Sequence, residues 1–93
     1  MFFGRARLDI LKIDVEGYEE RVIAGAKGLL EDGHRGPRAI FIEVHPYAWQ
    51  ATGTTSRSLL GMLEDCNYQI QDLAGKPVER IEEYGEVIAY RRY

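Results

Sequence analysis

Two apolar runs constrain the fold of this chain more than any other feature of its sequence. Residues 8–13 (LDILKI) and 39–44 (AIFIEV) are rich in leucine and β-branched residues, and their polar members are Asp9, Lys12 and Glu43. Short, nearly continuous apolar runs of this kind are typical of strands that are buried on both faces of a parallel sheet. Parallel strands need a crossover between them, and the intervening residues are long enough to form one. We therefore predict an α/β fold.

The segment between the two runs has the periodicity of a helix. Its apolar side chains fall on one stripe from Tyr18 to Leu30, and three glutamates precede or begin it, where the helix dipole favours negative charge: Glu16, Glu19 and Glu20. The predicted helix ends at EDGHRGP, where Gly33 can form a left-handed cap and Pro37 prevents continuation.

A second helix and two more strands complete the predicted order. Leu59, Leu63 and Cys66 share one helical face, after N-cap candidates that include Thr55. YQIQDL alternates like a half-exposed strand, and EVIAYR is a final strand that can pair antiparallel because no clear helix precedes it. The stretch 78–84 stays unassigned. The prediction is the order β-α-β-α-β-β in three layers, with the last strand antiparallel.

Composition and charge place the chain among small globular proteins. With 93 residues, 45% of them hydrophobic and 29% charged, it can form one core and is too apolar for a disordered tail. A net charge of −3 and scattered basic residues argue against binding to nucleic acid or to an anionic membrane. Cys66 is the single cysteine, and no apolar run is long enough to span a membrane. We expect one cytoplasmic domain over residues 1–93, with residues 1–7 as a disordered or artificially added leader.

Polar side chains follow both buried runs. Asp14 and Glu16 come after the first run, and Glu43 and His45 end the second. One residue separates the members of each pair, so both can point to the same side. In an open α/β sheet the ligand crevice lies outside the carboxyl ends of the parallel strands. If the two strands are neighbours, these four groups converge.

Structural roles compete with chemical ones at each of these positions. Asp14 can cap the following helix, and Glu16 can serve its dipole. His45 can hold a backbone carbonyl, and Glu43 needs a partner if it is buried. The four groups could also bind a divalent cation, but their spacing is not a dedicated metal motif, so we assign no metal ligand.

The loop after the second run adds two aromatic side chains. The sequence also lacks the glycine-rich motifs that bind nucleotide cofactors. Tyr47 and Trp49 of PYAW can wall a substrate pocket or pack over the sheet edge. The sequence contains no GxGxxG, no GxxxxGK[ST] and no glycine-rich turn directly after a strand. The usual cradle of a nucleotide or an adenosyl cofactor is therefore not recognisable in this chain.

The segment LKIDVEGYEERVIAGAKGLL, followed by IFIEVHP, YQI and VIAYR, resembles the C-terminal half of the FkbM family of S-adenosylmethionine-dependent methyltransferases over residues 8–91. The resemblance implies the C-terminal half of a class I, Rossmann-like methyltransferase sheet, in which the first strand here is the fourth. It also implies O-methylation of a hydroxyl on a small molecule or a sugar, with S-adenosylmethionine as cofactor. One of four matching residues would then be the general base: Asp14, Glu16, Glu43 or His45.

The same resemblance implies that much of the cofactor site is missing from this sequence. The family's cofactor loop and its ribose-binding acid belong to an N-terminal half, so we expect a fragment that is inactive alone and binds S-adenosylmethionine weakly. The edge of residues 8–13 would lack its neighbour, and we expect it to pair with a second copy in a homodimer. Two alternatives stay open: a non-catalytic interaction module or remnant, and an unrelated metal-dependent enzyme that uses Asp14, Glu16, Glu43 and His45.

Overall fold

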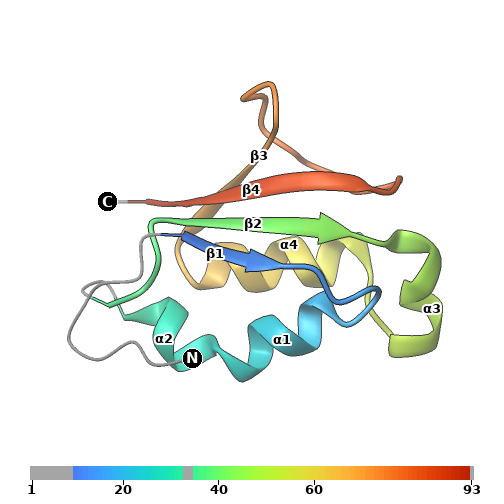
Figure 1. Ribbon diagram of the computed structural model, residues 1–93, viewed down its shortest axis with the longest axis horizontal. Helices are drawn as coiled ribbons and strands as arrows, with labels where there is room; N and C mark the ends of the chain where they lie inside the picture. Colours follow the sequence, from blue (N-terminus) through green and yellow to red (C-terminus); the bar gives the residue numbers. More distant parts are fainter. Residues whose placement is uncertain (1–9, 33–34, 93) are drawn as a thin grey trace.

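The computed structural model describes residues 10–32 and 35–92 and shows a mixed α/β fold. Its four strands form an open sheet in the order β1-β2-β4-β3 (Figure 1). The strands are β1 (Ile10–Ile13), β2 (Ala39–Val44), β3 (Tyr68–Asp72) and β4 (Gly85–Arg91). The helices are α1 (Glu19–Gly25), α2 (Lys27–Glu31), α3 (Trp49–Thr52) and α4 (Ser56–Asp65), with a short 3-10 helix, η1 (Pro46–Ala48). The predicted leader 1–7, the start of the predicted strand 8–13 and the predicted cap Gly33 lie outside the described residues.

The sheet contains one parallel pair and two antiparallel pairs. β1 runs parallel to β2, with Ile10 opposite Ala39 and Ile13 opposite Ile42. β4 lies between β2 and β3 and is antiparallel to both. The α/β class and the antiparallel last strand are therefore confirmed, whereas the Rossmann-like class and the three layers stay predictions. Because β1 and β2 are parallel neighbours, their carboxyl ends meet at the same end of the sheet.

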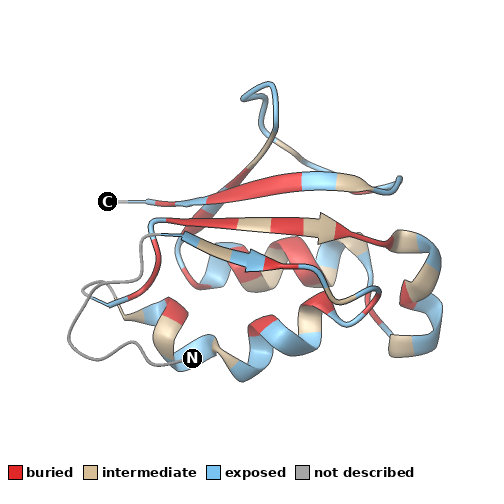
Figure 2. Ribbon diagram, in the orientation of Figure 1, coloured by how far each residue is buried: buried red, intermediate tan, exposed pale blue. Residues whose placement is uncertain are grey.

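One face of the sheet packs against the helices. In Figure 1, α1, α2 and α4 lie on the same side of the sheet, and α1 contacts α4. Three alternate side chains of β2 are buried in the same core as side chains of α1 and α4: Ile40, Ile42 and Val44. Figure 2 shows the buried parts of β2 in red. Burial of one large aliphatic side chain contributes about 1.5–3 kcal/mol. This shared core fixes the position of β2, and with it the position of the residues that follow β2.

The helices depart from the prediction in two places and follow it in a third. The predicted loop after β2 contains the short helices η1 and α3. The predicted first helix is divided at Ala26, whose N–H bonds to the carbonyls of Val22 and Ile23, both at 3.1 Å. α4 begins at the predicted cap Thr55, where the Ser58 N–H donates to Thr55 Oγ1 (3.0 Å) and the Thr55 N–H donates to Ser58 Oγ (2.9 Å). This reciprocal capping box satisfies two backbone donors and fixes the start of α4.

Arg91 of β4 connects the ends of the helices to the sheet. Its side chain is buried and donates to the carbonyl of Leu30 in the last turn of α2 (2.6 Å) and to that of Asp32 directly after α2 (2.7 Å). It also donates to the carbonyl of Cys66 (3.4 Å) after α4, and its guanidinium lies 4.8 Å from the ring centroid of Tyr68. Helix C-termini expose carbonyl oxygens and the negative end of the helix dipole, so a buried cation there is stabilising.

Candidate functional site

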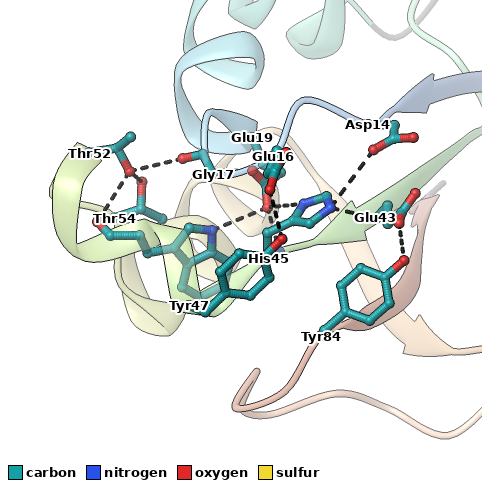
Figure 3. Close-up of polar contacts among 11 residues, drawn as sticks. Asp14, Glu16, Gly17, Glu19, Glu43, His45, Tyr47, Thr52, Thr54 and Tyr84 are labelled. Carbon is teal, nitrogen blue, oxygen red and sulfur yellow. Dashed lines mark hydrogen bonds and ion pairs between the residues drawn. The ribbon is translucent and has the colours of Figure 1, made fainter.

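The carboxyl ends of β1 and β2 bring together three of the four predicted polar residues (Figure 3). Asp14 directly follows β1, Glu43 lies in β2, and His45 directly follows β2. His45 Nε2 lies 3.7 Å from Glu43 Oε1 and 3.9 Å from Asp14 Oδ1. We call Asp14, Glu43 and His45 the carboxylate-imidazole cluster. The fourth predicted residue, Glu16, points to a different partner.

The members of the carboxylate-imidazole cluster are buried to different degrees. The side chain of His45 is only 6% exposed, that of Glu43 is 17% exposed, and that of Asp14 is 52% exposed. The two separations from His45 Nε2 exceed ordinary hydrogen-bonding distance. The imidazole is therefore held inside the protein with Nε2 facing two carboxylates, one of which reaches solvent.

Glu19 lies behind the imidazole and is fully buried. Its Oε1 accepts hydrogen bonds from the backbone N–H of His45 (2.8 Å) and from the Trp49 Nε1–H (3.2 Å), and it lies 3.5 Å from His45 Nδ1. Glu19 Oε2 and His45 Nδ1 have no hydrogen-bond partner among the described residues. Sequence reasoning treated Glu19 only as a charge at the start of a helix and missed its place in this site. The signal that could have found it is its position in the motif KIDVEGYE.

The turn between β1 and α1 explains why Glu19 points inward. Glu16 and Gly17 have positive φ angles of 27° and 93°, and the carbonyl of Gly17 accepts a hydrogen bond from Thr52 Oγ1 (2.9 Å). A Cβ atom at Gly17 would lie 2.7 Å from the Cβ of Ala48. The turn therefore needs glycine for two reasons, its conformation and its close approach to η1. Because the turn is tight, α1 starts beside the loop after β2 and its first residue, Glu19, is buried there.

Glu16 and Tyr47 form a separate pair at the surface. The Tyr47 hydroxyl donates to Glu16 Oε1 (2.9 Å), and this bond raises the pKa of Tyr47. Tyr47 is 67% exposed, and its ring packs edge-on against that of His45. Trp49, in contrast, is buried and bonded to Glu19, which favours packing over its alternative role as a pocket wall.

Tyr84 supplies a partner that the sequence did not indicate. It lies in the stretch that stayed unassigned, and its hydroxyl donates to Glu43 Oε1. This bond lowers the pKa of Glu43 and raises the pKa of Tyr84 to about 12. The Tyr84 ring centroid also lies 5.3 Å from that of His45. Glu43 is thus held in its ionised form beside the imidazole.

The cluster opens to the surface and is separate from the hollows found elsewhere in the described residues. One hollow, of about 470 Å³, is lined by Val44 and Gly85 together with residues of the β3–β4 connection. Another, of about 660 Å³, lies between the start of α4 and residues 78–80. Neither is lined by a member of the carboxylate-imidazole cluster. The arrangement can accept protons or hydrogen bonds, and its nitrogen and oxygen atoms are of the kind that bind cations.

Comparison with known proteins places this site inside a family match. The family model described as Methyltransferase FkbM domain matches residues 2–70, more than half of the chain. The match includes Asp14, Glu19, Glu43 and His45 and ends before Tyr84. No curated protein and no solved structure matches the chain. None of the described helices has the length and apolar character that crossing a lipid bilayer requires.

Proposed function

Because this chain belongs to the FkbM methyltransferase family, we propose that it forms the acceptor side of an S-adenosylmethionine-dependent O-methyltransferase. The acceptor would be a hydroxyl group on a small molecule or a sugar. The observation that carries the proposal is the buried imidazole of His45, whose Nε2 faces the carboxylates of Asp14 and Glu43 at the end of the sheet where ligands bind in α/β folds.

The cluster has the chemistry that an acceptor hydroxyl requires. Methylation of an alcohol needs a group that orients the hydroxyl and removes its proton. A hydroxyl placed beside Asp14, the exposed member, can donate a hydrogen bond to the cluster, and the cluster takes up its proton. Glu19 supports this role because it fixes the backbone of His45 and lies beside Nδ1.

The described residues fit an acceptor hydroxyl better than they fit S-adenosylmethionine. No glycine-rich turn follows β1 or β2, and the two hollows lie beside the β3–β4 connection instead of at the cluster. We therefore propose that this chain alone binds S-adenosylmethionine weakly and is inactive alone. Calorimetric titration with S-adenosylmethionine and S-adenosylhomocysteine tests this directly, and a dissociation constant in the micromolar range would contradict it.

Transfer of a labelled methyl group tests the acceptor chemistry. The protein is expressed with any coding sequence that precedes Met1 in the gene, and it is given methyl-labelled S-adenosylmethionine with a panel of sugars, small alcohols and amines. We expect label on oxygen, and we expect His45→Gln to lower kcat by about 100-fold or more. The control Asp65→Asn changes an exposed carboxylate at the end of α4, outside the cluster, and should keep the rate. Label on nitrogen alone, or an unchanged rate in His45→Gln, would contradict the proposal.

We also propose that the edge of β1 pairs with a second copy of the chain. β1 is the edge strand of the described sheet, and Ile10 on it is 60% exposed. Exposed apolar edge strands tend to pair with other strands. Analytical ultracentrifugation should show a dimer that Ile10→Lys weakens, and a monomeric mass at high concentration would contradict this proposal.

A further inference from the structure

We propose that Asp14, Glu43 and His45 form a binding site for a divalent transition-metal cation such as Mn²⁺ or Zn²⁺. One ligand atom from each of these side chains lies within 4.8 Å of the others. Two carboxylates and one imidazole match the oxygen and nitrogen ligands that such ions accept, and their two negative charges balance the charge of the ion. The binding itself does not depend on the proposed methyl transfer.

The distances in the cluster suit a bridging ion better than direct contact. His45 Nε2 lies 3.7 Å from Glu43 Oε1 and 3.9 Å from Asp14 Oδ1, too far for hydrogen bonds. Metal bonds of about 2.0–2.2 Å place neighbouring ligand atoms roughly 3–3.6 Å apart. Because the three ligand atoms lie within 4.8 Å of one another, side-chain movements of about 1 Å would seat an ion among them.

The buried imidazole is an independent reason to infer a ligand. His45 is 5% exposed, and buried polar side chains in proteins nearly always have hydrogen-bond partners. His45 Nε2 faces carboxylate oxygens of Asp14 and Glu43 beyond hydrogen-bonding distance, whereas Nδ1 faces Glu19 on the other side of the ring. A cation bound between these atoms would satisfy Nε2 and both carboxylates at once.

Two further residues are placed as the outer partners of metal ligands usually are. A histidine that binds metal through one nitrogen commonly directs the other toward a carboxylate, which fixes the tautomer and the ring orientation. Glu19 Oε1 lies 3.5 Å from His45 Nδ1 and is itself held by the Trp49 indole N–H. Tyr84 holds Glu43 in the same way through its hydroxyl. The imidazole is thus oriented with the Nε2 lone pair free for a cation.

The exposure of Asp14 leaves one side of this site open to solvent. An acceptor hydroxyl could reach an ion there, and a bound cation lowers the pKa of a coordinated oxygen. This use of the ion rests on the proposed function, whereas the site itself rests on the geometry of the cluster.

Titration of the 93-residue chain with Mn²⁺ tests the site without methyl donor or acceptor. Electron paramagnetic resonance of free Mn²⁺, together with calorimetry, should show one ion per chain. We expect Asp14→Asn and His45→Gln each to weaken binding at least about 10-fold. The matched control Asp65→Asn, which changes an exposed carboxylate at the end of α4 and outside the cluster, should change affinity by less than about 2-fold.

Pulsed resonance on the wild-type protein removes the dependence on variants that could misfold. A bound Mn²⁺ should show coupling to one imidazole nitrogen. Absence of stoichiometric binding at millimolar Mn²⁺ and Zn²⁺ would overturn the proposal, as would equal affinity in cluster and control variants, because both results would leave His45 as an ion-pair partner of carboxylates only. A failure here leaves the methyl-transfer proposal standing, and failure of the label-transfer assay leaves the cation site standing.

Discussion

The two ends of β2 each have a buried side chain that can carry positive charge, and the two differ in what surrounds it. At the amino end, Arg91 donates to backbone carbonyls of Leu30, Asp32 and Cys66. At the carboxyl end, His45 faces titratable carboxylate side chains at 3.5–3.9 Å. Backbone carbonyls cannot change their charge, so the Arg91 end can only hold the fold together. The His45 end can exchange protons or ions.

The largest expected effect on stability comes from removing the hydrogen bonds of the Arg91 side chain. Arg91→Met removes the bonds to the carbonyls of Leu30, Asp32 and Cys66, and we expect the free energy of unfolding to fall by about 3 kcal/mol, since hydrogen bonds to charged groups contribute about 1.5–3 kcal/mol. His45→Gln should cost less than about 1.5 kcal/mol because the ring contributes less hydrogen bonding. Urea unfolding of both variants measures the difference. Equal losses would show that both ends are structural and would remove the contrast.

The α/β class was predictable from sequence because burial of strands leaves a pattern in the residue types. The predicted strand 39–44 matches β2. Asp14, Glu43 and His45 lie at or directly after the ends of β1 and β2, so their meeting could be predicted by counting residues along the chain. Glu19 could not be found in this way. Its burial depends on the turn at Gly17, and a glutamate in the first turn of a helix is usually exposed to solvent.

Tyr84 was unpredictable for a different reason. It contacts Glu43 from 41 residues further along the chain, and it precedes β4 in a stretch without helix or strand periodicity. The position of Tyr84 follows from the pairing of β4 with β2, which places Gly85 opposite Val44. A contact of this range depends on strand order, and strand order within a sheet is not encoded in local periodicity.

A smaller effect is expected at the turn that positions Glu19. Gly17→Ala must adopt a φ of 93° and place its Cβ 2.7 Å from that of Ala48, so we expect a loss of about 2–3 kcal/mol in the free energy of unfolding. Gly53→Ala is the matched control, because Gly53 has a similar φ of 76° and nothing within 4 Å of an added Cβ. It should cost only about 1 kcal/mol. Equal losses in chemical denaturation would show that the contact with Ala48 does not matter.

Glu19→Gln sharpens the comparison at the His45 end. The amide oxygen can still accept the bonds from the His45 N–H and the Trp49 indole, so we expect at most about 1 kcal/mol of lost stability. Loss of the carboxylate charge beside His45 Nδ1 should weaken Mn²⁺ binding about 10–100-fold, as removal of outer partners of metal ligands does. Calorimetry on folded protein measures it. Unchanged affinity would mean that Glu19 only holds the backbone and the indole.

The smallest perturbation tests whether the Arg91 end is chemically inert. Cys66 lies there with 1% exposure, and burial raises the pKa of its thiol above the ordinary value of 9.0. Thiolate is the reactive form, and a raised pKa means that at pH 8 a smaller fraction of Cys66 is thiolate than of a free cysteine. Alkylation by iodoacetamide at pH 8 should therefore be at least about 100-fold slower than for a cysteine peptide, and urea should restore the peptide rate. Fast alkylation of the folded chain would mean that this end opens readily, and the division into a fixed end and a reactive end would then fail.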